Sequence, residues 1–78
     1  MARLRLFAQA REEAGTAQAE FAGATVGEVL DAAIAQFGSH FADVVGTSRI
    51  WVNGEPAEFD DSVSAADEIA VLPPVSGG

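Results

Sequence analysis

Apolar and polar residues alternate along two stretches of the sequence, one near its start and one near its end. Residues 3–8 read Arg-Leu-Arg-Leu-Phe-Ala, and residues 68–72 read Glu-Ile-Ala-Val-Leu. Because successive side chains of a β-strand point to opposite faces, this alternation predicts two strands that each bury one face. The residues expected on the buried face are Leu4, Leu6, Ala8, Ile69 and Val71. Phe7 and Leu72 would then lie on the opposite face.

Between these stretches, apolar residues recur at the spacing of one face of a helix. They are Val26, Val29, Leu30, Ala33, Ile34 and Phe37. Thr25 and Glu28 fit a capping box, in which each side chain accepts a hydrogen bond from a backbone N–H group at the start of the helix. Gly38 is a favourable residue for the end of the helix. We therefore predict one main helix with a buried face and an exposed face.

Shorter elements are expected on either side of this helix. Residues 11–16 contain Gly15 and are predicted to form a turn that leads into a returning strand at residues 17–21. After the helix, the apolar residues in 41–45 predict one short helical turn that packs beneath it.

The Asn53-Gly54 pair predicts a hairpin between residues 49–52 and residues 55–57. Asn-Gly suits a type I′ turn, whose two central residues both have positive φ angles. Because Pro56 has no backbone N–H, the returning strand should be very short or lie at the edge of the sheet.

The order strand, strand, helix and three shorter strands predicts an α+β fold of the β-grasp, or ubiquitin-like, architecture. In this fold a mixed sheet carries one main helix on one face, and the first and last strands lie parallel at its centre. Residues 1–72 would form the domain, and residues 73–78 would form a protruding tail. A length of 78 residues suits one domain.

The last six residues, Pro-Pro-Val-Ser-Gly-Gly, begin with two conformationally restricted residues and end with two that have no side chain. Pro73 and Pro74 lack backbone N–H groups and have fixed φ angles, so they would end the last strand and extend it as a stiff arm. Gly77 and Gly78 have no Cβ, so they could enter a narrow active site. The alternative interpretation is a frayed terminus without a function.

Composition restricts the class of partner. The formal charge of −8 argues against nucleic acid and favours a basic protein partner, although solubility alone also explains an acidic surface. Because the chain has no cysteine, any sulfur chemistry must use sulfur brought from outside. The chain also has no lysine, so the N-terminus is the only amine that an activated carboxyl group could acylate.

Other classes of site and of location are not favoured by the sequence. No apolar run approaches the roughly 20 residues that cross a bilayer, and no secretory signal is visible, so we expect a cytoplasmic protein that does not bind membranes. His40 has no visible catalytic partner and is expected at the surface, while Trp51 is expected to pack. No set of residues predicts a metal site or a catalytic triad.

Three segments together resemble the MoaD family, the small subunit of molybdopterin synthase, which is a MoaD/ThiS-type ubiquitin-like sulfur carrier. They are residues 6–12 (Leu-Phe-Ala-Gln-Ala-Arg-Glu), residues 52–55 (Val-Asn-Gly-Glu) and residues 67–78, which lead from Asp-Glu to the Pro-Pro and Gly-Gly pairs. The resemblance extends over essentially the whole chain. The family commonly has glycine just before Asp67, whereas this chain has Ala66.

The resemblance implies a sulfur carrier that is not catalytic alone and binds no cofactor of its own. An E1-like (MoeB-like) adenylating enzyme would use ATP to convert the Gly78 carboxylate to an acyl adenylate. A persulfide donor would then yield a thiocarboxylate at Gly78. This group would donate sulfur to precursor Z within a MoaE-like large subunit, in the biosynthesis of molybdopterin.

The resemblance also implies roles for individual residues. The tail that enters the partner would consist of Pro73, Pro74, Val75, Ser76 and Gly77, ahead of the reactive Gly78. The residues expected to contact the partner are Phe7, Leu72 and Arg11.

Two alternatives remain open. A carrier of this kind could instead supply sulfur for cysteine, thiamine or tRNA thiolation. A β-grasp module could also act without sulfur, either by binding proteins or as a modifier joined to lysines through Gly78.

Overall fold

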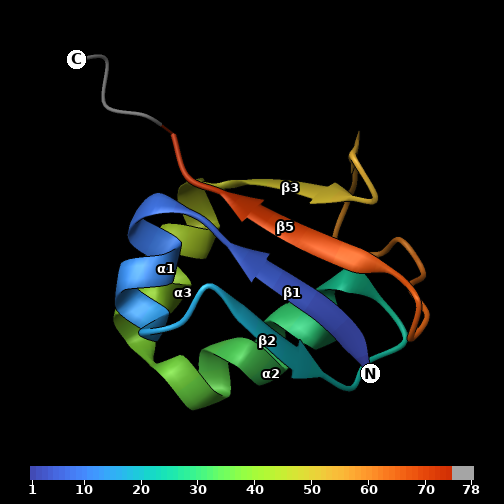
Figure 1. Cartoon of the computed structure of the whole chain (residues 1–78), viewed down its shortest axis with the longest axis horizontal. Helices are drawn as coiled ribbons and strands as arrows, with labels where there is room; N and C mark the ends of the chain where they lie inside the picture. Colours follow the sequence, from blue (N-terminus) through green and yellow to red (C-terminus); the bar gives the residue numbers. More distant parts are fainter. Residues whose placement is uncertain (75–78) are drawn as a thin grey trace.

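The two alternating stretches form the centre of the sheet in the computed structural model, which describes residues 1–74 (Figure 1). They become the parallel neighbours β1 and β5 in a five-stranded sheet with the order β2-β1-β5-β3-β4. The elements are β1 (Ala2–Leu6), α1 (Ala8–Ala14), β2 (Gln18–Phe21), α2 (Val26–Phe37), α3 (Ser39–Thr47), β3 (Arg49–Val52), β4 (Glu55–Pro56) and β5 (Glu68–Leu72). The predicted β-grasp fold, with its mixed sheet and central parallel pair, is confirmed.

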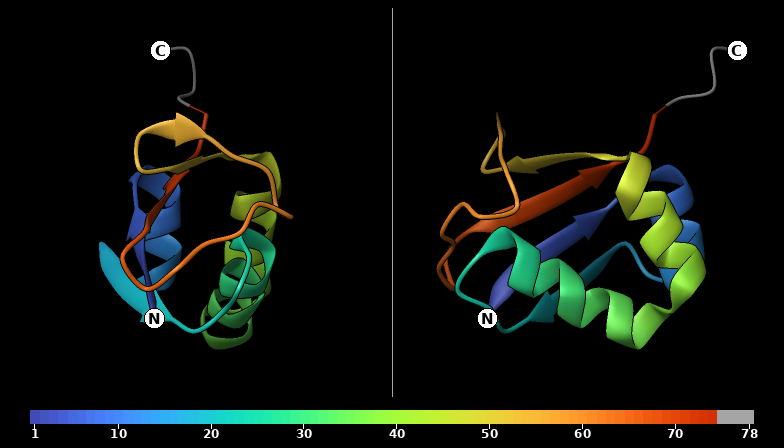
Figure 2. Two further views of the ribbon diagram at one scale, coloured as in Figure 1. Left: turned by 90° about the vertical axis from the view of Figure 1, so that its right-hand side faces the viewer. Right: turned by 180° about the vertical axis from the view of Figure 1, so that it is seen from behind.

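The register of β1 and β5 aligns the predicted buried residues. Leu4 lies opposite Ile69 and Leu6 opposite Val71, and each of these side chains is at most 2% exposed. The helices α2 and α3 cover this face of the sheet, while the opposite face is open (Figure 2). Burial of aliphatic side chains on one face of the sheet therefore fixes both the register and the layer order.

The main helix, α2, begins and ends as the sequence predicts. The Thr25 Oγ1 accepts a hydrogen bond from the Glu28 N–H at 3.2 Å, and the Glu28 Oε1 accepts one from the Ala24 N–H at 3.0 Å. At the other end, the Gly38 N–H donates to the Ile34 carbonyl at 2.9 Å. Both ends of the helix are thus fixed by local hydrogen bonds.

The prediction of a turn at residues 11–16 is wrong, because the helix α1 occupies most of this segment. The helix begins at Ala8, which the alternation assigns to the first strand. Its alanine, glutamine, arginine and glutamate residues are strong helix formers, and Ala10 is buried in the core. Gly15 ends the helix in the left-handed conformation, with φ at 76°.

The short helical turn predicted at residues 41–45 is longer than expected and forms α3, a helix of nine residues. Phe41 is fully buried, and its ring lies 5.1 Å from that of Phe37 at the end of α2. The Phe37 ring in turn lies edge-on to Phe21 of β2, at 5.8 Å. These aromatic contacts join both helices to the β2 edge of the sheet and explain why residues beyond 41–45 become helical.

The Asn53-Gly54 hairpin is confirmed. Asn53 has a φ of 51° and Gly54 a φ of 85°, which are the two positive values that a type I′ turn requires. The returning strand β4 has two residues and lies at the edge of the sheet, as Pro56 predicts.

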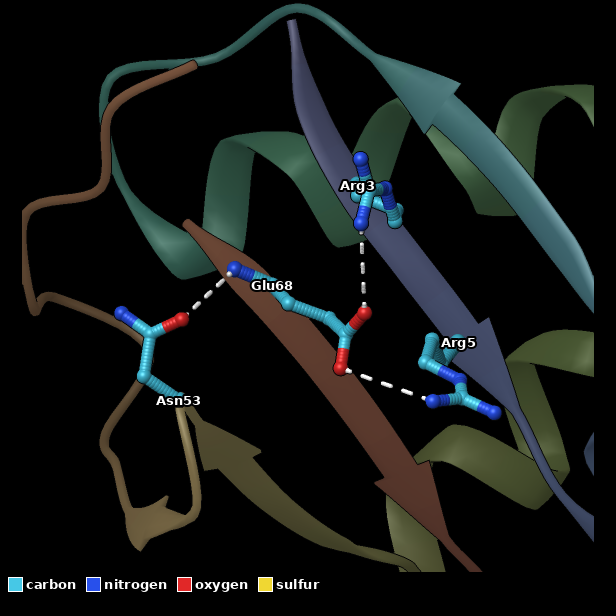
Figure 3. A network of polar contacts seen from close by, with 4 residues as sticks. All are labelled: Arg3, Arg5, Asn53 and Glu68. Carbon is cyan, nitrogen blue, oxygen red and sulfur yellow. Dashed lines mark hydrogen bonds and ion pairs between the residues drawn. The ribbon is translucent and has the colours of Figure 1, made fainter. Parts of the chain in front are cut away.

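Asn53 also ties this hairpin to the start of β5. Its Nδ2 donates to the Asp67 Oδ1 at 2.9 Å. Its Oδ1 accepts from the Glu68 N–H at 3.0 Å, as Figure 3 shows. The Asp67 Oδ2 accepts from the Ser64 N–H at 2.8 Å, in a turn that the Asp67 N–H closes on the Ser64 carbonyl. Ala66 lies within this turn without a positive φ, so the turn does not need the glycine that the family commonly has there.

Replacing Asp67 by asparagine should lower the free energy of unfolding near neutral pH. The Ser64 N–H, followed by the Asn53 side chain, holds the pKa of Asp67 below its ordinary value of 3.8. A carboxyl group with a lowered pKa stabilises the fold fully above its unfolded pKa, and this contribution is lost as the pH falls through its folded pKa. Urea unfolding from roughly pH 7 to pH 2 should therefore show the difference between the two proteins shrinking with acidity. Asp43→Asn, on the exposed surface of α3, controls for the loss of one charge, and a difference independent of pH would contradict this role.

Candidate functional site

The parallel strands β1 and β5 end at the same edge of the sheet, and the C-terminal tail follows β5 there (Figure 1). Phe7 and Leu72 come directly after the last paired positions of these two strands. Pro73 is buried and Pro74 is exposed. The packed part of the chain therefore includes Pro73, one residue beyond the predicted domain boundary. The remaining predicted tail residues lie outside the described part of the chain: Val75, Ser76, Gly77 and Gly78.

Phe7 occupies the junction between β1 and α1. Its backbone is extended, and its carbonyl accepts hydrogen bonds from the N–H groups of Ala10 and Arg11 at 3.0 and 3.4 Å. The side chain is 36% exposed, and the Arg5 Cζ lies 5.6 Å from the centre of its ring. This cation–π contact, worth about 0.5–1 kcal/mol at an exposed site, holds the ring on the open face of the sheet.

Four apolar residues from β3, β4 and β5 continue from Phe7 across the open face. Leu72 is half-buried, and Ala70 lies opposite Trp51, which in turn lies opposite Pro56. We call these residues the sheet patch: Phe7, Pro56, Trp51, Ala70 and Leu72. Trp51, which the sequence leads us to expect as a packing residue, is half-buried, and alternation along β3 turns Ile50 inward and therefore Trp51 outward. That alternation is the signal by which the sequence could have identified it.

Arginines frame the sheet patch and are held by one glutamate. The Glu68 Oε2 lies 3.7 Å from the Arg3 Nη1, and its Oε1 lies 3.9 Å from the Arg5 Nη1 (Figure 3). Arg49, opposite Leu72 in the register, is exposed on the same face. Exposed ion pairs contribute only about 0–1 kcal/mol, so their main effect here is to position Arg5 beside the patch.

Arg11, predicted to contact a partner, is exposed on α1. Because α1 follows the end of β1 directly, the helix lies at the end of the sheet from which the tail leaves (Figure 1). The positive side chain near the C-terminal end of α1 also interacts favourably with the helix dipole. The structure thus brings Arg11 to the tail end of the molecule on an element that the sequence did not predict.

Within residues 1–74 there is no cluster of three or more His, Asp or Glu side chains that could hold a metal ion. His40 is at the surface, with its Nδ1 3.9 Å from the Glu13 Oε1. No helix of the described chain has the length and apolarity needed to cross a membrane. The reactive group expected from the sequence, the Gly78 carboxylate, lies outside the described residues.

Comparison with known proteins agrees with this arrangement. The model of the ThiS family matches residues 4–78. Small archaeal modifier protein 1 of Haloferax volcanii is 37% identical over 84 aligned positions, which cover 95% of this chain and 97% of that protein. Its crystal structure gives a TM-score of 0.83 at 34% identity and covers 99% of this chain and 98% of that one.

Two further solved structures have the same fold. Small archaeal modifier protein 1 of Methanosarcina acetivorans gives a TM-score of 0.88 at 28% identity, covering 99% of this chain and 95% of that one. The complex of subunits 1 and 2 of the molybdopterin-converting factor of Helicobacter pylori contains a chain with a TM-score of 0.70 at 23% identity, which shows the fold alone and covers 99% of this chain and 97% of that one. The chain belongs to the ThiS family and has the ubiquitin-like β-grasp fold of the MoaD/ThiS-type small modifiers and sulfur carriers.

Proposed function

We propose that this protein is a sulfur carrier that acts as the small subunit of a molybdopterin synthase. The observation that carries the proposal is the family match, which extends through Gly77 and Gly78. The position of the tail supports it, because β5 delivers the tail to the edge of the sheet beside the sheet patch. A partner that binds the patch would receive the tail in its own active site.

The proposed reaction begins at the Gly78 carboxylate, which is a poor electrophile. An E1-like enzyme joins this carboxylate to AMP from ATP and releases pyrophosphate, which gives an acyl adenylate with a good leaving group. The terminal sulfur of a persulfide donor attacks the acyl carbon and expels AMP. A second thiol then cleaves the sulfur–sulfur bond, which leaves a thiocarboxylate on Gly78 and a disulfide on the donor.

The thiocarboxylate sulfur would be the nucleophile in the second half of the cycle. In a MoaE-like large subunit it would transfer sulfur to precursor Z, and hydrolysis would return the Gly78 carboxylate. The role of the folded domain in this step is to position the tail. Buried Pro73 anchors the root of the tail, and the fixed φ angles of the two prolines limit the directions that the tail can take.

The sheet patch would be the surface that each partner contacts in turn. The adenylating enzyme and the synthase both need the same tail, so both must bind at the edge of the sheet from which it leaves. Aromatic and apolar groups at the centre of an interface supply most of its binding energy, and Phe7 and Trp51 are suited to this role. Arg5 and Arg49 at the margin would meet carboxylates or backbone carbonyls of the partner.

A second candidate function is protein modification, in which the activated Gly78 acylates a lysine of another protein. The similarity to small archaeal modifier protein 1 of Haloferax volcanii favours this alternative specifically. The two functions share the adenylation step and differ in the nucleophile that follows. Incubation with the adenylating enzyme and ATP, with and without a persulfide donor, distinguishes a thiocarboxylate product from lysine-linked conjugates.

Deleting Gly78, or replacing Gly77 by valine, should abolish formation of the thiocarboxylate and leave the fold intact. Deletion moves the carboxylate back along the tail, and a β-branched side chain at position 77 obstructs a narrow channel. Mass spectrometry after incubation with adenylating enzyme, ATP and sulfur donor should show the replacement of one oxygen by sulfur only in the unaltered protein. Thermal unfolding is the control: a fall in the melting temperature of more than about 4 °C, or roughly 1 kcal/mol, would show that these glycines are structural.

Phe7→Ala and Leu72→Ala should each weaken binding to the synthase subunit by about tenfold or more, because the sheet patch would lose an apolar contact. Their unfolding should change much less than that of Leu4→Ala, whose fully buried side chain should cost about 2–5 kcal/mol of stability. Calorimetric measurement of each variant's affinity for the synthase subunit, together with its midpoint of urea unfolding, tests this prediction. If both patch variants unfold easily yet bind normally when folded, these residues belong to the core and not to an interface.

A further inference from the structure

Phe59 is a large apolar side chain exposed outside the sheet patch. It is 55% exposed, and the other exposed large apolar residues of the described chain are Met1, at the start of the sequence, and Phe7. Phe59 lies between β4 and β5, in a segment that crosses the helical side of the domain (Figure 2). A single exposed aromatic residue is common on protein surfaces, so its meaning depends on how it is held.

The backbone around Phe59 is a closed turn. The Asp61 N–H donates to the Glu58 carbonyl at 3.1 Å, and the Asp61 Oδ2 accepts from the Glu58 N–H at 2.8 Å. Phe59 and Asp60 are the two central residues of this turn and project at its tip. The exposure of the aromatic ring is therefore a property of an ordered turn.

The same turn is attached to the first residues of α2. The Phe59 carbonyl accepts from the Gly27 N–H at 2.7 Å, and the Asp61 carbonyl accepts from the Val26 N–H at 3.0 Å. These bonds satisfy two N–H groups that have no partner within the helix. A Cβ on residue 27 would lie 3.1 Å from the Phe59 oxygen, so Gly27 permits this close approach. Glycine is less favourable than alanine in a helix, and here it permits the contact that fixes an exposed aromatic residue.

Phe59 borders a groove between α2 and α3. We call this groove, with Phe59 at its margin, the α2–α3 groove. Its lining residues are Gly27, Leu30, Asp31, Ile34, Ala42, Val45, Gly46 and Phe59. Ile34 and Ala42 are partly exposed in the groove, whereas Leu30 and Val45 are buried beneath it, and both helices lie on the side of the sheet opposite the open face (Figure 2). The groove thus lies on the other side of the sheet from Arg3 and Arg5, while Phe59 at its margin also lines a hollow with Arg49 and Trp51.

One acidic residue lines the α2–α3 groove, and three more lie in the turn at its margin. Asp31 lines it, and Glu58, Asp60 and Asp61 belong to the turn that carries Phe59. None of these four forms an ion pair with a residue of the described chain. On the open face of the sheet, by contrast, Glu20 and Glu68 lie opposite Arg3, so their charges are balanced there, whereas the four carboxylates in and beside the groove have no such partner among the described residues. Such a field repels a second copy of this chain and attracts a basic segment.

We propose that the α2–α3 groove is a second docking site, for a segment of another protein that presents apolar side chains flanked by lysine or arginine. The apolar side chains would pack on Phe59 and Ile34, and the basic side chains would face Asp31 and Asp60. The sheet patch lies on the opposite side of the sheet, so a protein bound in the groove leaves the tail free for its own partner. This site does not depend on the proposed sulfur chemistry.

The test uses the isotope-labelled full chain and a synthetic amphipathic peptide with leucines on one face and lysines beside them. Titration followed by two-dimensional NMR should shift the amides of Leu30, Ala42 and Gly46 more than those of Arg5 and Trp51. Phe59→Ala should weaken this binding by about tenfold. Asp60→Asn, which removes no hydrogen bond seen in the structure, should weaken it about two- to threefold at low salt and less at high salt.

The matched controls separate the site from general attraction to an acidic surface. Asp43→Asn removes the same charge from α3 at a position that does not line the groove, and should have a smaller effect than Asp60→Asn. The same peptide with glutamates in place of lysines should not bind. The proposal is overturned if the shifts centre on the sheet patch, if Phe59→Ala binds like the unaltered protein, or if both acidic variants weaken binding equally. A dimer of the chain alone that Phe59→Ala dissociates in sedimentation experiments would also overturn it.

Discussion

The parallel pairing of β1 with β5 is the constraint on which the rest of the molecule depends. It joins residues from the two ends of the sequence through the buried contacts of Leu4 with Ile69 and of Leu6 with Val71. Parallel neighbours cannot be connected by a tight turn, so every other element must lie in the chain between them. The same pairing brings Phe7 to the edge of the sheet from which the tail leaves. The parallel pairing that forms the core therefore also determines which residues lie beside the root of the tail.

Much of this fold could be predicted because the signals are local. Alternation gives the faces of β1 and β5, the Thr25 and Glu28 capping box gives the start of α2, and Asn53-Gly54 gives the hairpin. The helix α1 could not be predicted with the same rule, because its seven residues bury only Ala10 and so show no apolar period. Its helical state follows from the propensity of its residues and from the glycine that ends it.

The candidate site was only partly predictable, because it is assembled across strands. Phe7 and Leu72 could be placed on one face from the alternation within each strand. Trp51 joins them only through the order of the strands, which sets β3 beside β5. The burial of Pro73 likewise depends on contacts beyond its neighbours in sequence, since proline by itself predicts only that the ladder ends. Long-range arrangement, not residue type, decides which apolar groups share a surface.

The fold also separates charges between the two sides of the molecule. The sheet places Arg3, Arg5 and Arg49 on the open face, whereas Asp31 and the acidic turn that carries Phe59 lie on the helical side. A partner drawn by the overall negative field would meet that field most strongly on the helical side, whereas the tail leaves beside the arginines. The surface that attracts a partner protein over a long range thus differs from the surface that contacts the partner beside the tail. A carrier that must leave one enzyme for another gains from this separation, because the charges that speed encounter do not all contribute to the contact that must later break.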